Sequence, residues 1–424
     1  MTRGHYLWFL NILFFATSTH NVRAEKITLE QAKKYAIRKN YHLESLRQQR
    51  AALVADLEIL RTNFLPKLAL LGGLNSYGEV IREITPTGFF QLEYNLFNQN
   101  IDQMRLELAK IKIEKAELLL KKESFFISLA VENVFHTYVY LHDLVELQMS
   151  SLKMNNTHKT LVSKTKNAGL SSATDVMEFQ LKDAILSSDL ELLQHQLEES
   201  RISLKTLLGE ELGSKLTPIG SIQHQHLKGN LMSYLDQIRS KNTQILSATL
   251  DLQEIHTKNS LWRSSWLPKI DLNFKAGQLP AALRERKNEI KMEFLLTFNY
   301  EFFSGFKSQY ELKKQRALTA KSENILKAEI LTSVANVEKS FRKLKTIERR
   351  VDLEENNVHR STIYYKGIKK EYLRGYKNSA DLASAAEKYI ESKKRKIEFM
   401  FDFLSAKIKL ERTLGAKIEV EVID

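Results

Sequence analysis

The sequence contains no cysteine. Disulfides, thiolate metal sites and cysteine nucleophiles are therefore excluded. The sequence also lacks the HExxH, GxGxxG and P-loop patterns of metalloproteases, dinucleotide-binding domains and nucleoside triphosphatases. We therefore expect no catalytic residues, no cofactor and no metal ion.

Proline is scarce, with five residues in a chain of 424. Residues 87–217 and 281–424 contain none. Proline destabilises the interior of a helix by about 3 kcal/mol. The two proline-free stretches, which are rich in Leu, Lys, Glu and Ala, therefore permit very long helices.

The sequence also has no apolar run of about 20 residues, the length that a helix needs to cross a bilayer. A shorter apolar stretch, Tyr6 to Phe15, follows a basic start at Arg3 and precedes a small-residue cleavage site at Val22-Arg23-Ala24. This pattern is typical of a secretory signal peptide. We predict that residues 1–24 are removed and that the mature chain, starting near Glu25, lies outside the cytoplasm without a lipid anchor.

Charge is unevenly distributed within the net value of +13. Residues 1–217 hold 26 Lys and Arg against 25 Asp and Glu, whereas residues 218–424 hold 38 against 26. A basic chain can bind nucleic acid or an anionic membrane surface. Lysines interspersed with glutamates also form ordinary solvated helix faces, and the export signal argues against nucleic acid as a partner.

The chain is an internal duplication of a unit of about 200 residues, far longer than a solenoid repeat. Early matches lie 202 residues apart and later ones 206 apart, which one insertion in a loop between about residues 70 and 94 explains. The matched pairs are Asn40 and Asn242, Leu65-Pro66-Lys67 and Leu267-Pro268-Lys269, Tyr94 and Tyr300, Phe97 and Phe303, Gly169 and Gly375, Asp175 and Asp381, and Leu208-Gly209 and Leu414-Gly415.

Apolar residues in steps of three and four predict coiled-coil-like helices in both copies. The first copy shows them at Val131, Val134, Tyr138, Leu141 and Val145, and the second at Val334, Val337, Phe341, Leu344, Ile347 and Val351. We predict long helices over about 98–168 and 304–374, each roughly 105 Å long at about 1.5 Å per residue. Shorter helices are predicted over about 172–208 and 378–414.

Period-two alternation of apolar and polar residues predicts strands over about 66–76, 88–97, 268–278 and 290–303. Each strand has about the length of a transmembrane β-strand, and aromatic residues on one face with charges on the other fit a barrel with lipid outside and water inside. Four strands cannot close a barrel, and open edges are not tolerated in lipid. We therefore expect protomers to pool strands, with three protomers giving twelve.

The predicted fold class is mainly α with membrane β. The first repeat spans 25–217 and the second 231–417, each holding a helix, two strands, a long helix and a shorter helix. A linker, 218–230, and a tail, 418–424, complete the chain.

This order resembles that of the TolC-type outer-membrane efflux proteins across essentially the whole mature chain. The resemblance is carried by Ile27-Thr28-Leu29-Glu30-Gln31-Ala32 with Asn40, by both Leu-Pro motifs, by Tyr94-Asn95-Leu96-Phe97 and Tyr300-Glu301-Phe302-Phe303, and by the helix turns Gly169 to Val176 and Gly375 to Leu382. It implies a homotrimer with a 12-stranded barrel in the outer membrane and a helical tunnel through the periplasm. It further implies passive export, by efflux or type I secretion, of substrates delivered by an inner-membrane transporter through a periplasmic adaptor.

The resemblance also implies that the two helix turns form the periplasmic tip, where the channel opens and the adaptor docks. The residues concerned are Gly169, Ser172, Asp175, Gly375, Ser379 and Asp381, with Asp381, Ser384, Arg374 and Lys370 as candidates for the pore constriction. In some family members two acidic residues three apart ring the constriction, whereas here Asp381 is followed by Ser384. The aspartates also suit a purely structural role, because a carboxylate in the first turn of a helix is stabilised by about 0.3–1 kcal/mol.

Two further interpretations remain open. His224-Gln225-His226 has the form of a metal clip but has no third ligand nearby in sequence, so we do not expect a metal site there. The alternative function is a periplasmic or surface coiled-coil structural protein without a pore. The predicted strands distinguish the two, since a pore-forming protein needs detergent and a structural rod does not.

Overall fold

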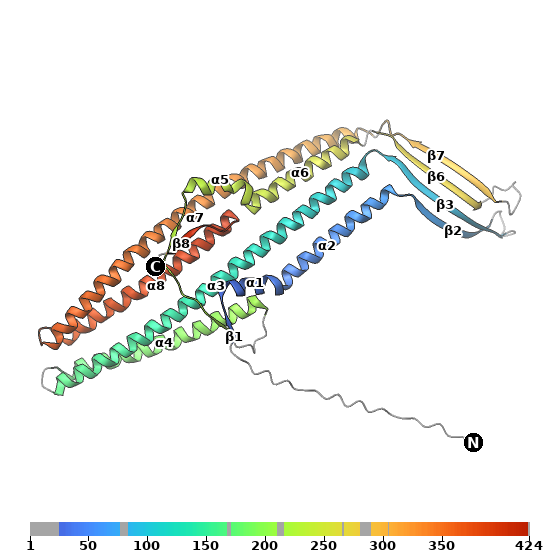
Figure 1. Ribbon diagram of the computed structural model, residues 1–424. Coiled ribbons are helices and arrows are strands. Elements are labelled where there is room, and N and C mark those ends of the chain that lie inside the picture. The colour runs from blue at the N-terminus through green and yellow to red at the C-terminus, as the bar shows by residue number, and fades with distance from the viewer. Residues whose placement is uncertain are drawn as a thin grey trace, which may run out of the picture.

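The computed structural model describes residues 25–76, 84–167, 171–209, 216–264, 267–279, 290–303 and 305–422. The molecule is elongated, with a four-stranded sheet at one end and the turns of two long helical hairpins at the other (Figure 1). None of the helices in the described ranges is both long and apolar enough to span a membrane.

The two repeats contain the same order of main elements. The first consists of β1 (Glu25–Ile27), α1 (Leu29–Lys39), α2 (Tyr41–Arg61), the 3-10 turn η1 (Thr62–Phe64), β2 (Lys67–Ser76), β3 (Ile84–Asn98), α3 (Ile101–Asn167) and α4 (Ala173–Leu208). The strands β4 (Leu216–Pro218) and β5 (Gln225–Leu227) lie at the connection between the repeats. The second repeat consists of α5 (Leu231–Lys241), α6 (Thr243–Ser264), β6 (Lys269–Gln278), β7 (Lys291–Asn299), α7 (Lys307–Leu373) and α8 (Ser379–Leu414), and β8 (Val420–Val422) follows it in the tail.

The long helices confirm the mainly helical fold class and the duplication. Helices α3 and α7 both have 67 residues, and α4 and α8 both have 36. At about 1.5 Å per residue, each long helix extends roughly 100 Å. Strand β7 ends at Asn299, short of the expected end at 303, whereas β3 begins at Ile84, ahead of the expected start at 88.

One helix was expected before each Leu-Pro motif, and the structure has two. The break falls at Asn40 in the first repeat and at Asn242 in the second. Both residues are extended, with ψ near 117°, and so cannot continue a helix. Each side-chain oxygen then caps the following helix, accepting hydrogen bonds from the backbone N–H groups of Leu43 at 3.0 Å and of Ile245 at 3.1 Å.

The sheet is antiparallel throughout, in the order β2-β3-β6-β7, so β2 and β7 are its edges. Its register separates two faces, because directly paired residues share a face. One face is apolar and largely exposed, with the cross-strand rows Leu68–Leu92–Phe274–Phe294, Leu70–Phe90–Ala276–Met292 and Tyr94–Leu272–Leu296. The other face is mostly polar, with the rows Lys67–Glu93–Asn273–Leu295, Ala69–Gln91–Lys275–Glu293 and Asn95–Asp271–Thr297.

Apolar clusters fill the interior between the helices. Each repeat has its own cluster about midway along its hairpin, and a smaller cluster near the turns joins both repeats. The first repeat's cluster includes Val131, Phe135 and Leu204, the second's includes Val337, Leu344 and Leu410, and the shared one consists of Val162, Phe179, Tyr372 and Leu382.

Short strands and buried charges tie the repeats together near mid-length, a region we call the waist. It consists of the pairs β1–β4 and β5–β8, together with four charged side chains. Lys417 Nζ lies 2.5 Å from Glu132 Oε2 and 3.0 Å from Glu411 Oε2, and Lys33 Nζ lies 2.8 Å from Glu132 Oε2. The waist therefore fixes the C-terminal segment of the second repeat against α3 of the first.

A glycine follows the last residue of α4 and of α8. The two glycines have similar backbone conformations but different surroundings. Gly209 and Gly415 have φ of +68° and +81°, in the left-handed region. A Cβ at Gly415 would collide with the carbonyl oxygen of Lys241, whereas one at Gly209 would lie 3.8 Å from the carbonyl oxygen of Lys39.

We expect Gly209→Ala to lower the free energy of unfolding by about 1–2 kcal/mol, the cost of a left-handed non-glycine residue. Gly415→Ala should lower it further, because the backbone must also shift. Thermal denaturation followed by circular dichroism measures both. Equal losses for the two variants would show that the close approach at Gly415 does not matter.

Candidate functional site

The candidate site is the end of the molecule where the α3–α4 and α7–α8 hairpins turn. The two turns lie at the same end, opposite the sheet (Figure 1). Gly375 has φ of +81°, and the backbone N–H of Tyr376 bonds the carbonyl of Glu371 at 3.0 Å, closing the second turn. Gly169, its counterpart in the first turn, lies outside the described residues.

The aspartates of both turns cap the helices that follow. Ser172 Oγ accepts the N–H of Asp175 at 3.1 Å, while the Asp175 carboxylate accepts the N–H of Ser172 at 2.8 Å. Asn378 and Asp381 form the same reciprocal arrangement at 2.8 and 3.4 Å. The capping role expected for the two aspartates is therefore present in both repeats.

The two turns also contact each other. The Ser379 hydroxyl, in α8, donates to the Asp175 carboxylate, in α4. Hydrogen bonds from the Ser172 backbone and from Ser379 lower the pKa of Asp175. Three of the expected tip residues, Ser172, Asp175 and Ser379, are thus brought together in one hydrogen-bonded group.

Aromatic side chains of α7 join the tip to α3. His158 Nε2 lies 2.8 Å from the Tyr365 hydroxyl, and Thr165 Oγ1 lies 3.2 Å from the Tyr372 hydroxyl. Burial, together with the nearby charge of Lys369, lowers the pKa of His158 to about 4. This histidine is therefore neutral at physiological pH and serves as a hydrogen-bonding core residue. These contacts could not be predicted from the sequence, because the two partners in each pair are 207 residues apart.

The candidate constriction residues are more exposed. Lys370, Arg374 and Ser384 are exposed, and Asp381 is partly exposed. Asp381 Oδ2 lies 3.9 Å from Lys377 Nζ, so its charge is partly balanced locally. The described tip therefore presents more positive than negative charge at α7 and α8.

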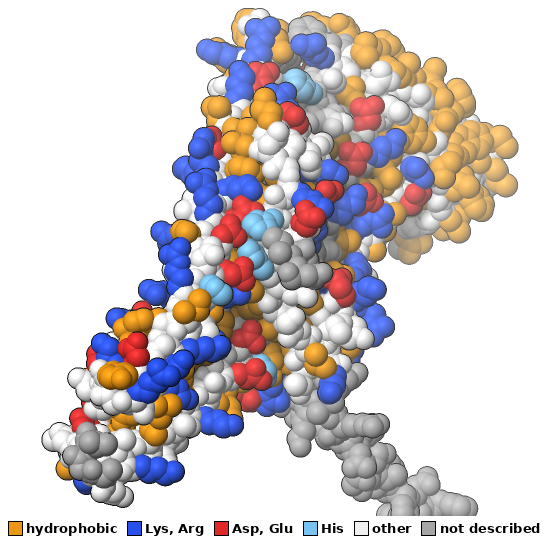
Figure 2. All heavy atoms as spheres, turned by 60° about the vertical axis from the view of Figure 1, so that its left-hand side comes forward, with side chains coloured by type: hydrophobic (Ala, Val, Ile, Leu, Met, Phe, Trp, Pro, Cys, Tyr) orange, Lys and Arg blue, Asp and Glu red, His pale blue; other side chains and the backbone are white. Residues whose placement is uncertain are grey.

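The surface differs in polarity between the two ends of the molecule. Figure 2 shows hydrophobic side chains gathered over the sheet end and charged side chains scattered over the helices. The apolar face includes the exposed residues Leu68, Leu70, Leu74, Phe90, Phe294, Leu296 and Phe298. An apolar band on strands next to a polar helical body is the pattern typical of proteins that are embedded in a membrane at the strands and surrounded by water along the helices.

Residues 234–416 match the family model described as "Outer membrane efflux protein". The fold is shared with solved structures at low identity. A membrane protein from Pseudomonas aeruginosa has 17% identity and a TM-score of 0.77, with 92% of this chain and 90% of that chain covered. The outer membrane protein VceC from Vibrio cholerae has 14% identity and a TM-score of 0.77, covering 92% and 97%. The MtrE outer membrane channel of Neisseria gonorrhoeae, in its open state, has 14% identity and a TM-score of 0.76, covering 94% of each chain.

A search of the curated proteins finds no match. The family model, which matches most of the second repeat, and the shared fold of the solved structures agree with the resemblance to the TolC-type outer-membrane efflux proteins seen in the sequence.

Proposed function

We propose that the protein is a passive channel-tunnel that exports substrates handed to it by an inner-membrane transporter through a periplasmic adaptor. The observation that carries this proposal is the four-stranded sheet with one apolar face and with two edges, β2 and β7, that pair with no further strand in the described part of the chain. Unpaired edges are not tolerated in lipid, so the edges must pair with those of other protomers. An eight-stranded barrel is filled by side chains, so a water-filled pore needs at least a third protomer.

The polar face of the sheet and the two helical hairpins line the proposed route of a substrate through the protein. With the apolar face toward lipid, the rows that contain Lys67, Glu93 and Asp271 line the barrel interior. The hairpins then continue the path for roughly 100 Å into the periplasm. A structural rod without a pore would need no such path. An exposed apolar face on its strands would promote aggregation.

Sedimentation of the detergent-extracted mature chain tests the assembly. We expect a single species of three chains that requires detergent to stay in solution. A monomer that is soluble without detergent would contradict the proposal.

At the tip we propose that the adaptor docks near the hydrogen-bonded group Ser172, Asp175 and Ser379, with Gly375 giving the second turn its shape. We place Asp381, Ser384, Lys370 and Arg374 near the pore entrance. The ring of two acidic residues that some family members have is incomplete here, because Ser384 carries no charge and Lys377 partly balances the charge of Asp381.

We therefore expect a pore entrance that does not favour cations, since rings of like charge set selectivity. Asp381→Asn should shift the selectivity further toward anions, because the positive charges of Lys370 and Arg374 then lose their acidic neighbour. The reversal potential across a planar bilayer under a salt gradient measures this shift, with Asp175→Asn as the matched variant in the first repeat. A strongly cation-selective channel that Asp381→Asn leaves unchanged would show that Asp381 and the basic cluster lie away from the constriction.

A further inference from the structure

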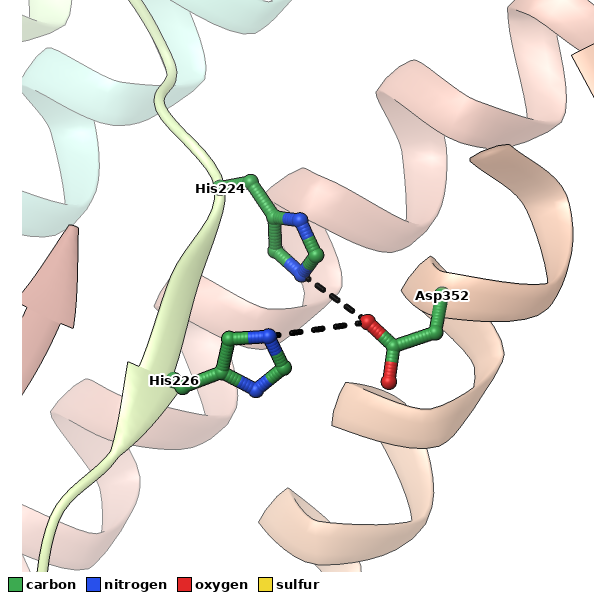
Figure 3. Close-up of side chains that lie close together, drawn as sticks. All are labelled: His224, His226 and Asp352. Carbon is green, nitrogen blue, oxygen red and sulfur yellow. Dashed lines mark ion pairs between the residues drawn. The ribbon is translucent and has the colours of Figure 1, made fainter. Parts of the chain in front are cut away.

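His224 and His226 lie at the waist, in the segment that connects the two repeats. Because they are two residues apart at the start of strand β5, both side chains point to the same side. Asp352 of α7 lies opposite them (Figure 3). Its Oδ1 is 3.2 Å from His224 Nε2 and 3.7 Å from His226 Nε2. The third ligand that the sequence did not offer nearby is thus supplied by a helix more than a hundred residues away.

The spacing of these atoms is that of ligands around one metal ion. Zn²⁺ binds imidazole nitrogen and carboxylate oxygen at about 2.0–2.2 Å in tetrahedral sites, which places neighbouring ligand atoms roughly 3.3–3.6 Å apart. The two nitrogen-to-oxygen separations, 3.2 and 3.7 Å, lie close to this range. The three ligand atoms all lie within 4.8 Å of one another. Only small side-chain rotations are therefore needed to bind an ion.

In both rings Nε2 is the inner nitrogen, which faces Asp352, and Nδ1 is the outer nitrogen, which faces a second carboxylate. His226 Nδ1 lies 3.0 Å from Glu348 Oε1, and His224 Nδ1 lies 3.4 Å from Glu355 Oε2. Glu348 is itself held in place by the backbone N–H of Leu227 at 2.8 Å. Carboxylates behind ligating histidines fix the proton on the outer nitrogen and leave the inner nitrogen free to bind a metal. Here this arrangement occurs at both histidines.

With the protons on the outer nitrogens, two lone pairs and one carboxylate oxygen converge on the same point. His224 Nε2 is buried without a hydrogen-bond partner in the described part of the chain. Glu348 and Glu355 have cationic partners of their own, Lys345 at 2.7 Å and Lys396 at 2.5 Å. The ionic contacts described for Asp352 are those with the two histidines. The point between these three residues is therefore suited to a cation.

We propose that His224, His226 and Asp352 form a binding site for a divalent transition-metal ion of the Zn²⁺ type, with water at the fourth position. Two imidazoles and a carboxylate suit borderline metals such as Zn²⁺ better than Mg²⁺ or Ca²⁺, which prefer oxygen ligands. A bound ion joins the connection between the repeats to α7. It therefore stabilises the waist, independently of any solute that passes through the channel.

The test uses the full-length trimer in detergent, purified without a polyhistidine tag and treated with chelator. Titration with Zn²⁺ followed by calorimetry should give one high-affinity ion per chain. Asp352→Asn preserves the shape of the side chain but removes the charge, and should weaken binding by at least tenfold. His142→Gln is the matched control, because His142, Asp143 and Glu146 form another His-carboxylate group that is mostly exposed and has one histidine instead of two.

X-ray absorption of the Zn²⁺-loaded wild type gives a readout that does not depend on any variant folding. We expect two imidazoles in the coordination sphere. Glu355→Gln, which leaves all three ligands in place, should weaken binding by about tenfold. The proposal is overturned if the wild type binds no Zn²⁺ at micromolar concentrations, if its spectrum shows fewer than two imidazoles, or if His142→Gln abolishes binding. The first of these results would mean that protons, not a metal ion, occupy the space between the three side chains.

Discussion

Replacing Lys417 with Met should lower the free energy of unfolding by about 3 kcal/mol. Lys417 contacts two carboxylates that are almost fully buried, Glu132 and Glu411, with side-chain exposures of 4% and 1%. Removing one partner of a buried ion pair costs about 3–5 kcal/mol. We expect the lower end, because Lys417 is itself half exposed and Glu132 keeps Lys33 as a second partner. The midpoint of thermal denaturation of the trimer in detergent reports the loss.

The pH dependence of this variant gives a second check. Burial raises the pKa of Glu411, although Lys417 opposes the shift, so loss of the lysine should raise that pKa further. A carboxyl group whose pKa is higher in the folded than in the unfolded state takes up a proton on folding between these two pKa values, so stability increases as the pH falls through the folded pKa toward the unfolded one. The deficit of Lys417→Met should therefore shrink as the pH is lowered through the raised pKa of Glu411 toward the ordinary pKa of a glutamate.

Two further variants calibrate the result. Adding Glu411→Gln to Lys417→Met should recover much of the loss, because the unpaired buried charge is then gone. Lys182→Met removes the exposed pair with Glu387 and should cost less than about 1 kcal/mol. If Lys417→Met were as mild as Lys182→Met, the waist charges would not join the repeats.

Placing Lys at Leu296 should destabilise the trimer by about 2–4 kcal/mol if this site lies near the middle of the bilayer. Leu296 is exposed on the apolar face and pairs with Leu272, which in turn pairs with Tyr94. A lysine there must enter lipid or distort the strand. The yield of heat-resistant trimer in outer-membrane extracts measures the effect.

The neighbouring residue provides the matched control. Thr297 lies on the polar face in the row of Asp271 and Asn95, so Thr297→Lys should cost much less, with the new charge in water and beside a carboxylate. Equal trimer yields from the two variants would show that the sheet is not placed with the apolar face toward lipid.

Much of the architecture could be predicted from the sequence, because its signals are local and occur twice. Steps of three and four along Val131 to Val145 can be read within one helix, and the 206-residue offset identifies the same helix in the second repeat. The period-two alternation of apolar and polar residues likewise predicted β6 and β7. The breaks at Asn40 and Asn242 were missed, since helix propensity on both sides is high and only the capping geometry distinguishes two helices from one.

Features that depend on distant partners could not be predicted. Strands β1 and β4, and β5 and β8, have three residues each, too few for an alternating pattern, and each pairs with a segment almost 200 residues away. Asp352 meets His224 and His226 only because α7 passes β5. The contact between Asp175 and Ser379 likewise joins two turns from different repeats.

Cysteine cross-linking tests most directly whether protomers pool their strands into one barrel, and the chain offers a background free of cysteine. Ala69→Cys on edge strand β2 is combined, one at a time, with Cys at Glu293, Leu295 or Thr297 on edge strand β7. Disulfides form only when Cα atoms lie within about 7 Å. Gln91→Cys on the inner strand β3 is the control, since it stays two strands, or roughly 9–10 Å, from any β7 partner.

We predict that oxidation of at least one Ala69→Cys combination yields covalent dimers and trimers on denaturing gels, whereas the Gln91→Cys combinations stay monomeric. Monomers from all three β2–β7 combinations, in protein that is folded and membrane-inserted, would contradict the pooled barrel.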